Sequence, residues 1–211
     1  MKNKQINSED LEIVINLASI KDASGVHSVL MKNLVEIEDF DALPKEERDK
    51  LEKNGFLRKK VDMEYYKHLI EDPNVDVYIA KYKNKKVIGF ATLHKDETDV
   101  KSVRDTAIRL HIIDDLTKEL LTSKNMKFTY LDQICINPKF QRKKIGTAIL
   151  NKALEKLVDP IVSFIVKVPI TNKASAYWHE QNGFILAATC DGAYKGKIFE
   201  WWIYIHWNRK N

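Results

Sequence analysis

A dense basic cluster stands where an apolar run gives way to a helical pattern. Arg142, Lys143 and Lys144 fall at the start of the amphipathic run "KKIGTAILNKALEKL", residues 143–157, just after the strand-like run "YLDQICI", residues 130–136. A helix N-terminus carries partial positive charge, so cations there destabilise an empty helix end. Its unpaired backbone N–H groups, however, bind phosphate well. The arrangement therefore predicts a binding site for a phosphorylated ligand, whose charge the cations would meet.

Candidates for proton transfer lie on the strand before this cluster. Successive side chains of a strand point to opposite faces. One face is therefore expected to hold Tyr130, Asp132, Ile134 and Ile136, and the other Leu131, Gln133 and Cys135. A carboxylate on such a strand needs a polar partner, whether or not it takes part in catalysis. The six histidines and two cysteines show no metal-ligand spacing, so we predict no metal.

Composition places these residues in an ordinary globular chain. With 211 residues, 44% hydrophobic and 31% charged, the sequence can bury one substantial core. No uncharged apolar run approaches the roughly 18 residues of a membrane span, and "MKNKQINSED" lacks the apolar region of a signal peptide. Cys135 and Cys190 are too few for a disulfide scaffold. We therefore expect a cytoplasmic protein without a membrane segment.

The net charge of +5 and pI near 9 permit a polyanionic partner but do not require one. Basic residues are spread through helices and turns instead of gathered in one tail. Nucleic acid is therefore not the expected partner, because a small phosphorylated ligand satisfies the same charge.

Hydrophobic periodicity predicts one mixed α/β domain over residues 1–211. Strands are expected at 11–18, in a hairpin over 75–96 around "KNKK", and at 127–136, 161–168, 184–190 and 198–207. Helices are expected at 22–34, 61–72, 143–157 and 171–183, and residues 41–55 form a polar, helix-prone segment over an irregular connection. A charge-rich segment at about 96–126, with apolar residues at helical intervals, is predicted to be a helical insertion between two strands.

Two motifs in this order resemble the GCN5-related N-acetyltransferase (GNAT) superfamily. The family signature Gln/Arg-x-x-Gly-x-Gly/Ala aligns with Gln141–Gly146, after a strand and Pro138. An Asn-headed helix that ends in Gly-Phe aligns with Asn172 through Gly183-Phe184. The resemblance runs from about residue 11 to the end, apart from the insertion. It implies a mostly antiparallel central sheet of about seven strands, with strands four and five splayed apart and helices on both faces.

The resemblance also implies an activity. Such a protein would transfer acetyl from acetyl-CoA to a primary amine, which we expect to belong to a small molecule, by direct attack in a ternary complex. Backbone N–H groups of the fourth strand and the phosphate-binding turn would hold coenzyme A, and Asn172 would contact the pantetheine arm. The implied cofactor-binding residues are Ile134, Cys135, Ile136, Gln141, Arg142, Lys143, Lys144, Ile145, Gly146, Thr147 and Asn172.

The sequence departs from the family signature at one position. Lys144 stands where the signature has its first glycine, and glycine in such turns permits positive φ or close approach of a ligand. We expect Lys144 to have ordinary helical dihedrals, because the position falls in the first turn of the helix.

The resemblance also suggests catalytic residues. Asp132 is the expected general base, acting through water with Tyr130 nearby. His179 occupies the position of the tyrosine that the family places four residues before the Gly of Gly-Phe, so it is the expected acid, as an imidazolium. Tyr177 is the alternative acid. Helical geometry separates it from His179 by about 200°, so the two side chains cannot both face the sulfur of the thioester. An acyl-cysteine at Cys135 is not favoured, because strand alternation points that thiol away from the thioester.

Other functions remain open. The same fold would suit acetylation of a protein amine or an aminoacyl-tRNA, and the missing glycine would suit a non-catalytic acyl-CoA-binding module. The long aromatic strand at residues 198–207 could pair across a homodimer axis, because an exposed apolar edge otherwise favours aggregation.

Overall fold

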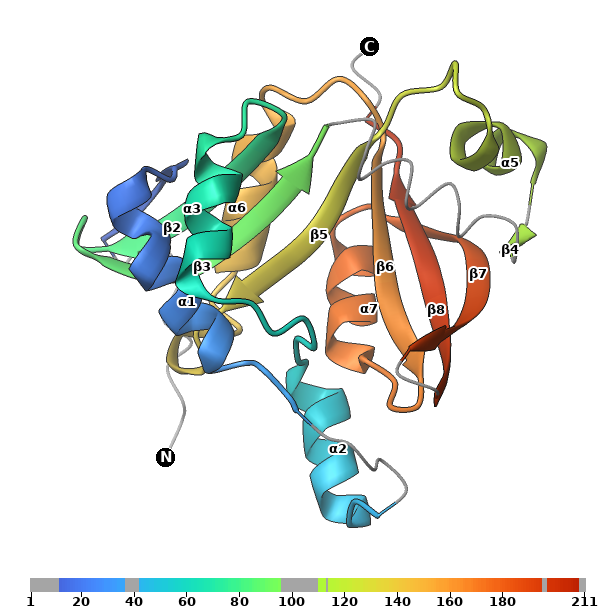
Figure 1. Cartoon of the computed structure of the whole chain (residues 1–211), viewed down its shortest axis with the longest axis horizontal. Helices are drawn as coiled ribbons and strands as arrows, with labels where there is room; N and C mark the ends of the chain where they lie inside the picture. The colour runs from blue at the N-terminus through green and yellow to red at the C-terminus, as the bar shows by residue number, and fades with distance from the viewer. Residues whose placement is uncertain (1–11, 37–41, 96–109, 113, 195–196, 209–211) are drawn as a thin grey trace. The chain divides into compact units, whose positions relative to one another are not determined.

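A computed structural model describes residues 12–36, 42–95, 110–112, 114–194 and 197–208 of the chain (Figure 1). Within these ranges no helix is both long enough and apolar enough to cross a bilayer. The chain divides into two compact units, residues 1–34, 57–93 and 132–156 in the first and 35–56, 94–131 and 157–211 in the second. The single-domain organisation stays a prediction.

The sheet of the first unit contains strands in the order β1, β2, β3, β5. Their bounds are β1 Ile13–Leu17, β2 Val75–Tyr82, β3 Lys86–His94 and β5 Thr129–Ile136, of which residues 132–136 belong to this unit. Strands β1 and β2 pair antiparallel, with Ile13 opposite Tyr82. Lys83 and Asn84 both have positive φ, 50° and 51°, at the turn between β2 and β3. This is the backbone of a two-residue hairpin turn, so the hairpin predicted around "KNKK" is confirmed.

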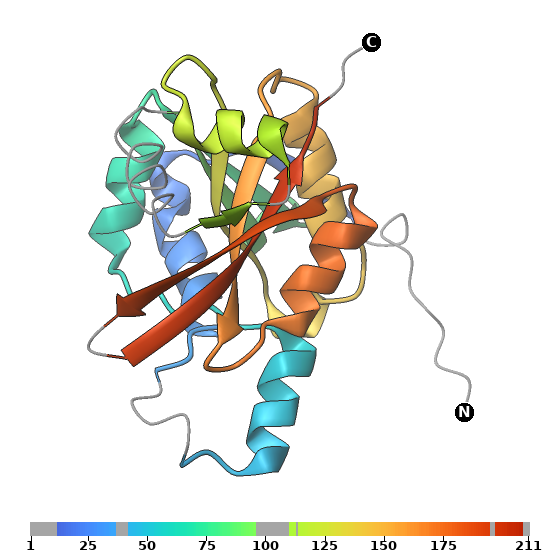
Figure 2. The same cartoon turned by 90° about the vertical axis from the view of Figure 1, so that its right-hand side faces the viewer.

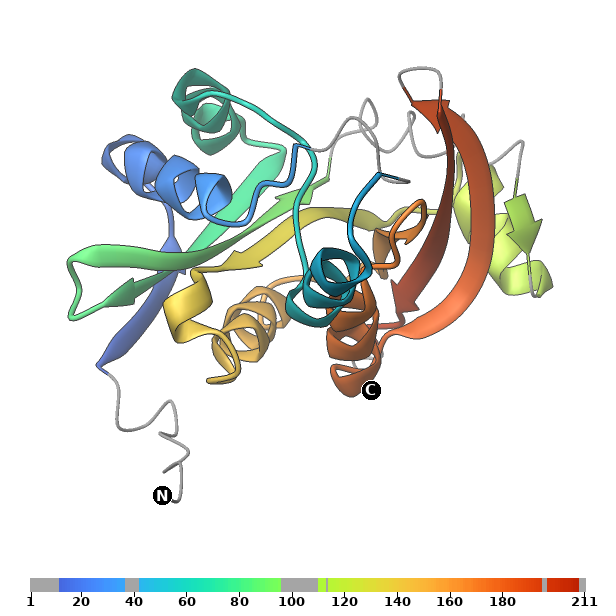
Figure 3. The same cartoon turned by 90° about the horizontal axis from the view of Figure 1, so that it is seen from below.

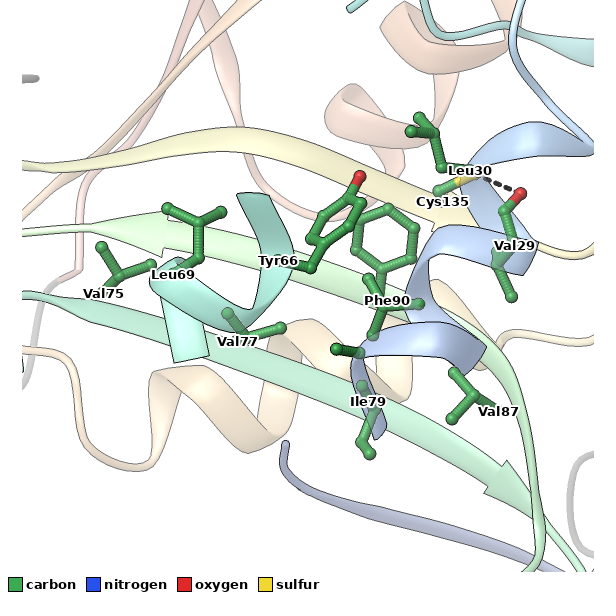
Figure 4. Close-up of a cluster of buried hydrophobic side chains, with 12 residues drawn as sticks. Val29, Leu30, Tyr66, Leu69, Val75, Val77, Ile79, Val87, Phe90 and Cys135 are labelled. Atoms are coloured by element: carbon green, nitrogen blue, oxygen red, sulfur yellow. Dashed lines mark hydrogen bonds between the residues drawn. The ribbon is translucent and has the colours of Figure 1, made fainter. Parts of the chain in front are cut away.

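Helices cover both faces of this sheet. The 3-10 helix η2 (Ile20–Asp22) leads into α1 (Ala23–Met31), which lies with α3 (Met63–Glu71) on one face, while α6 (Ile145–Leu154) lies on the other (Figure 3). Side chains of α1, α3 and the strands form one buried cluster (Figure 4). The approach of α1 to β3 depends on Gly25, because a Cβ there would lie 2.7 Å from Cγ2 of Val87. The cluster fixes the helices against the strand that carries Asp132.

The second unit contains strands in the order β5, β6, β8, β7, β4. Its elements are α2 Lys45–Asn54, β4 Leu110–Ile112, α5 Asp115–Thr122, β6 Ile161–Val168, α7 Lys173–Gln181, β7 Ile185–Tyr194 and β8 Lys197–His206. The long β7–β8 hairpin faces the viewer in Figure 2, and α5 and α7 lie on opposite sides of it (Figure 3). A buried cluster under α5 includes Leu120, Phe128 and Ile203.

One pair of strands in the sheet is parallel. Residue Thr129 of β5 is opposite Ile161 of β6 and Tyr130 is opposite Val162, and the register between these two fully described strands extends no further. The other pairs in the sheet are antiparallel. The predicted fold class, a mixed and mostly antiparallel sheet with two splayed central strands and helices on both faces, is confirmed.

Part of the predicted helical insertion is a strand. Residues 96–109 and 113 lie outside the described residues, but Leu110–Ile112 forms β4, which pairs antiparallel with β7 opposite Cys190, Thr189 and Ala188. The edge of β7 offers unpaired backbone groups, and pairing with them outweighs a helical pattern of only a few apolar residues. The helix α5 accounts for the end of the segment, with Asp114 as its N-cap.

Candidate functional site

A basic turn, residues 137–144, connects β5 to α6 in the first unit. It begins with the 3-10 helix η4 (Pro138–Phe140), which Asn137 caps by accepting a hydrogen bond from the Lys139 N–H at 3.1 Å. Asn137 is itself buried, and its backbone N–H donates to the Ile88 carbonyl at 2.8 Å. The start of the basic turn is therefore fixed to strand β3.

Gln141 holds the middle of the basic turn. Its Nε2 donates to the Ile136 carbonyl and to Oδ1 of Asn33, both at 3.3 Å. Asn33 follows α1 and donates from its own amide to the Val29 carbonyl at 2.9 Å. The side chain of Gln141 thus ties the basic turn to the end of β5 and to α1. Its contact with a cofactor stays a prediction.

The backbone conformation of Lys144 differs from our expectation. Lys144 is the N-cap of α6, with φ 57° and ψ 16°, in the left-handed region, and Arg142 also has positive φ, 60°. The expected helical dihedrals of Lys144 are therefore wrong. The chain must turn from the extended backbone of Gln141 into the axis of α6, and two left-handed residues make that reversal. Each such conformation costs a residue with a Cβ about 1–2 kcal/mol.

This geometry leaves the start of α6 open. The first backbone hydrogen bond of the helix runs from the Ala148 N–H to the Lys144 carbonyl at 3.0 Å, and the Lys144 side chain provides no cap. The N–H groups of Ile145, Gly146 and Thr147 therefore precede the hydrogen-bond ladder of the helix. A left-handed residue followed by helical ones turns successive N–H groups into one concavity that suits an anion.

The side chains around the opening are cationic. Arg142 and Lys144 are exposed, and Lys143 is half-buried with its ammonium 5.7 Å from the centre of the Phe140 ring. Three cations beside three backbone donors match a diphosphate in charge and in hydrogen-bonding capacity. The described residues of the basic turn therefore fit the diphosphate of coenzyme A.

Upstream on β5, Asp132 takes part in a small polar cluster that sequence reasoning missed. Its side chain is 12% exposed, and Oδ2 lies 3.0 Å from Nζ of Lys59. Lys59 precedes α3, donates to the Tyr65 hydroxyl at 2.7 Å and lies 4.8 Å from the centre of that ring. Burial lowers the pKa of Lys59, but Asp132 and the Tyr65 hydroxyl together raise it above its ordinary value. Lys59 therefore carries a positive charge beside the expected base.

The alternation predicted for β5 is confirmed. Leu131, Gln133 and Cys135 are buried, whereas Asp132, Ile134 and Ile136 are half-buried. Sγ of Cys135 lies 3.9 Å from the Val29 carbonyl oxygen. Burial raises the pKa of the Cys135 thiol, so the sulfur stays protonated and is a poor nucleophile.

Two predicted residues of the second unit have structural contacts of their own. The Tyr130 ring stands edge-on to Phe164, with centroids 5.9 Å apart. Asn172 caps α7 by accepting from the Ser175 N–H at 3.2 Å, and its Nδ2 donates to the Phe56 carbonyl at 3.0 Å. The amide of Asn172 is thus engaged at both ends, and its contact with pantetheine stays a prediction.

The two acid candidates on α7 differ sharply in exposure. Tyr177 is 64% exposed, whereas His179 is fully buried against Phe184 and Tyr204, with ring centroids at 4.7 and 5.7 Å. Nδ1 of His179 lies 2.7 Å from the Ser175 carbonyl oxygen, which can only accept, so Nδ1 carries the proton. Burial lowers the pKa of His179 to about 4. The prediction of an imidazolium acid at His179 is therefore wrong, because the ring is neutral at pH 7.

Comparison with known families decides the identity. The family model described as "Acetyltransferase (GNAT) family" matches residues 37–184, well over half of the chain. The chain belongs to the GNAT family. It is accordingly an acetyltransferase, and the resemblance drawn from the two motifs is confirmed. A comparison with curated protein sequences finds no match.

Solved structures of GNAT proteins share this fold. NAA60 of Arabidopsis thaliana in complex with acetyl-CoA is 12% identical, with a TM-score of 0.57 over 92% of this chain and 98% of that one. The ribosomal-protein-S18-alanine N-acetyltransferase of Escherichia coli is 14% identical, with a TM-score of 0.55 over 92% of each chain. The PaiA N-acetyltransferase of Thermoplasma acidophilum in complex with coenzyme A is 16% identical, with a TM-score of 0.52 over 90% and 98%. At these identities the likeness concerns the fold.

The left-handed Lys144 at the glycine position of the GNAT signature leads to a stability prediction. Lys144→Gly should raise the free energy of unfolding by about 1 kcal/mol, because glycine adopts positive φ without the Cβ clash. Lys144→Ala is the matched control, since it removes the same charge but keeps the Cβ. Urea unfolding compares the two variants. Equal stability of the glycine and alanine variants would contradict the left-handed assignment.

The buried His179 of this GNAT chain predicts loss of stability in acid. Because its folded-state pKa is about 4 and its ordinary value 6.5, the unfolded chain binds a proton that the folded chain rejects between those pH values. The free energy of unfolding should therefore fall by about 2 kcal/mol from pH 6.5 to 5. Urea unfolding at several pH values gives the free energy of unfolding as a function of pH. This free energy should fall less steeply with decreasing pH in His179→Gln than in the wild type. The control is His68→Gln, because His68 is exposed. If the free energy of unfolding of His179→Gln depends on pH as steeply as that of the wild type, the prediction is refuted.

Proposed function

We propose that the chain transfers the acetyl group of acetyl-CoA to a primary amine of a small molecule, by direct attack in a ternary complex. The observation that carries this proposal is the start of α6, where the left-handed Lys144 provides no side-chain cap and three backbone N–H groups precede the helical hydrogen-bond ladder, directly after three cations in the chain. A diphosphate held there would direct the pantetheine arm along β5, where residues 134–136 lead back to Asp132. The pantetheine contacts and the base are thus on one continuous segment.

Asp132 would act on the amine as the general base. An alkyl amine is protonated at pH 7, so a proton must leave before the nitrogen can attack the thioester carbonyl. As the N–C bond forms, backbone N–H groups of Ile134 to Ile136 would stabilise the negative charge on the carbonyl oxygen. The C–S bond then breaks and the thiolate takes a proton. Tyr177, which is exposed, is the remaining candidate for the acid.

Direct attack fits the surroundings of Cys135. An acyl-enzyme route needs a thiolate that can reach the thioester, but Cys135 is buried in the cluster of α1 and α3. The raised pKa of its thiol further disfavours a covalent intermediate.

The approach to Asp132 supports a slender acceptor. Asp132 is 12% exposed at its side chain, yet the unbranched alkyl chain of Lys59 brings an ammonium group to 3.0 Å from its carboxylate. A primary amine on an unbranched chain matches that path. The acceptor amine must then either replace the Lys59 ammonium beside Asp132 or bind next to it.

Two-substrate kinetics tests this proposed function. Release of coenzyme A is measured while acetyl-CoA and each of a panel of small primary amines are varied. We expect turnover with at least one amine and intersecting double-reciprocal lines, which indicate a ternary complex. Parallel lines would indicate an acyl-enzyme instead. Turnover only with peptides or aminoacyl-tRNA, or acetyl-CoA binding without any turnover, would refute the small-amine acceptor.

A further inference from the structure

Lys59 meets the geometric requirement for an acetyl acceptor. A general base must lie within hydrogen-bond distance of the amine from which it removes a proton. Nζ of Lys59 lies 3.0 Å from Oδ2 of Asp132. Its side chain is 47% exposed while its amine contacts the carboxylate. The Tyr65 hydroxyl, at 2.7 Å, orients the same amine from another side.

We propose that Lys59 is acetylated by the acetyl-CoA that its own chain binds. This inference rests on the proposed function, because it uses the same base and the same donor. The Lys59 ammonium loses one proton to Asp132, and the nitrogen lone pair attacks the thioester carbonyl carbon. The N–C bond forms, the C–S bond breaks, and the second proton from nitrogen ends on the thiolate of coenzyme A. Asp132 afterwards releases its proton to solvent.

Acetylation would change the charge of the cluster. Nε-acetyl-lysine is neutral, so the ion pair between Lys59 and Asp132 would be lost. The acetamide N–H can still donate a hydrogen bond to the Tyr65 hydroxyl or to Asp132. Each chain would be modified once and would not turn over. The modified enzyme would present Asp132 without its lysine ammonium, which leaves that carboxylate for an external amine.

The adjacent Lys60 provides an internal reference. Both lysines are exposed and adjacent in the segment before α3. Because Asp132 and the Tyr65 hydroxyl raise the pKa of Lys59, chemical acetylation in solution should not favour Lys59 over Lys60. Among the described ion pairs, those of Lys67 with Glu64 and Lys152 with Glu155 join neighbours within one helical segment. The pair of Lys59 and Asp132 joins residues 73 positions apart. The pairs of Lys81 with Asp22 and Lys167 with Glu200 also join distant residues, but the carboxylate that Lys59 contacts is on β5. Selective acetylation of Lys59 therefore requires the folded cluster.

Peptide mass spectrometry of the full chain after incubation with acetyl-CoA tests the inference. We expect one acetyl group on Lys59, formed about 100-fold faster than on Lys60, and a rate constant that does not change on dilution of the protein. Asp132→Asn should slow the reaction by a similar factor. Lys59→Arg, which keeps the charge, should lose this one acetyl group from the mass of the intact chain.

The outcomes separate this inference from the proposed function. Calorimetric titration with coenzyme A is run on the same samples. Coenzyme A binding together with equal labelling of Lys59 and Lys60 overturns acetylation of Lys59 and leaves the proposed function intact. A labelling rate constant that rises with protein concentration also overturns it, because transfer would then occur between molecules. Absence of coenzyme A binding would overturn the proposed function itself.

Discussion

Asp132→Asn should lower kcat about 100-fold or more, without weakening acetyl-CoA binding. The amide cannot accept the proton that the attacking amine must lose, whereas the contacts of the diphosphate lie at the basic turn. The expected signature is therefore a large loss of kcat at nearly constant affinity for coenzyme A. Initial rates at saturating acetyl-CoA and calorimetric titration measure the two quantities separately.

The substitution also removes the partner of the Lys59 ammonium, so its effect on folding needs a control. Asp49→Asn on α2 makes the same change in charge at an exposed position. Thermal unfolding of both variants shows whether Asp132→Asn remains folded at the assay temperature. If the folded Asp132→Asn variant retains kcat within about threefold of the wild type, Asp132 is not the base and only pairs with Lys59.

The parts of the fold that depend on local pattern were predictable from the sequence. The hairpin around "KNKK" and the alternating faces of β5 follow from neighbouring residues, and the structure agrees. The strand β4 was not predictable in this way. It forms because the edge of β7, more than 70 positions later in the chain, offers backbone partners that no local pattern reveals.

The candidate site was predictable in its backbone and less so in its side chains. The basic turn and Asp132 could be predicted because they lie close together on one segment of the sequence, where their spacing indicates a strand followed by a helix start. Lys59 is one lysine among many in the sequence, and only folding brings it 3.0 Å from a residue 73 positions away. His179 was assigned as an acid from its place in a motif, but that place lies against the aromatic core of α7 and β8, where burial keeps it neutral.

Lys144 illustrates a related limit. The sequence gives a lysine where the family signature has glycine, and a lysine favours ordinary dihedrals. The observed positive φ shows that the geometry of the turn outweighs that local preference. The left-handed conformation of Lys144 costs about 1–2 kcal/mol, which stabilising interactions elsewhere in the fold offset.

Neutralising the basic turn should strongly weaken the binding of coenzyme A. The variant carries Arg142→Gln, Lys143→Gln and Lys144→Gln. If each of the three cations contributes about 1 kcal/mol to holding phosphate, the loss is about 3 kcal/mol, or roughly 100-fold in Kd. Lys45→Gln, Lys50→Gln and Lys53→Gln on α2 form the control variant, which loses the same total charge from exposed positions. The comparison thus separates local phosphate contacts from the general attraction of a basic protein.

Isothermal titration of coenzyme A into the wild type and these two triple variants tests the central claim most directly. We predict measurable binding by the wild type, nearly the same Kd for the α2 variant, and a Kd about 100-fold higher for the basic-turn variant. Equal Kd values for all three proteins, or no heat of binding to the wild type, would contradict the claim that the basic turn and the start of α6 hold the diphosphate.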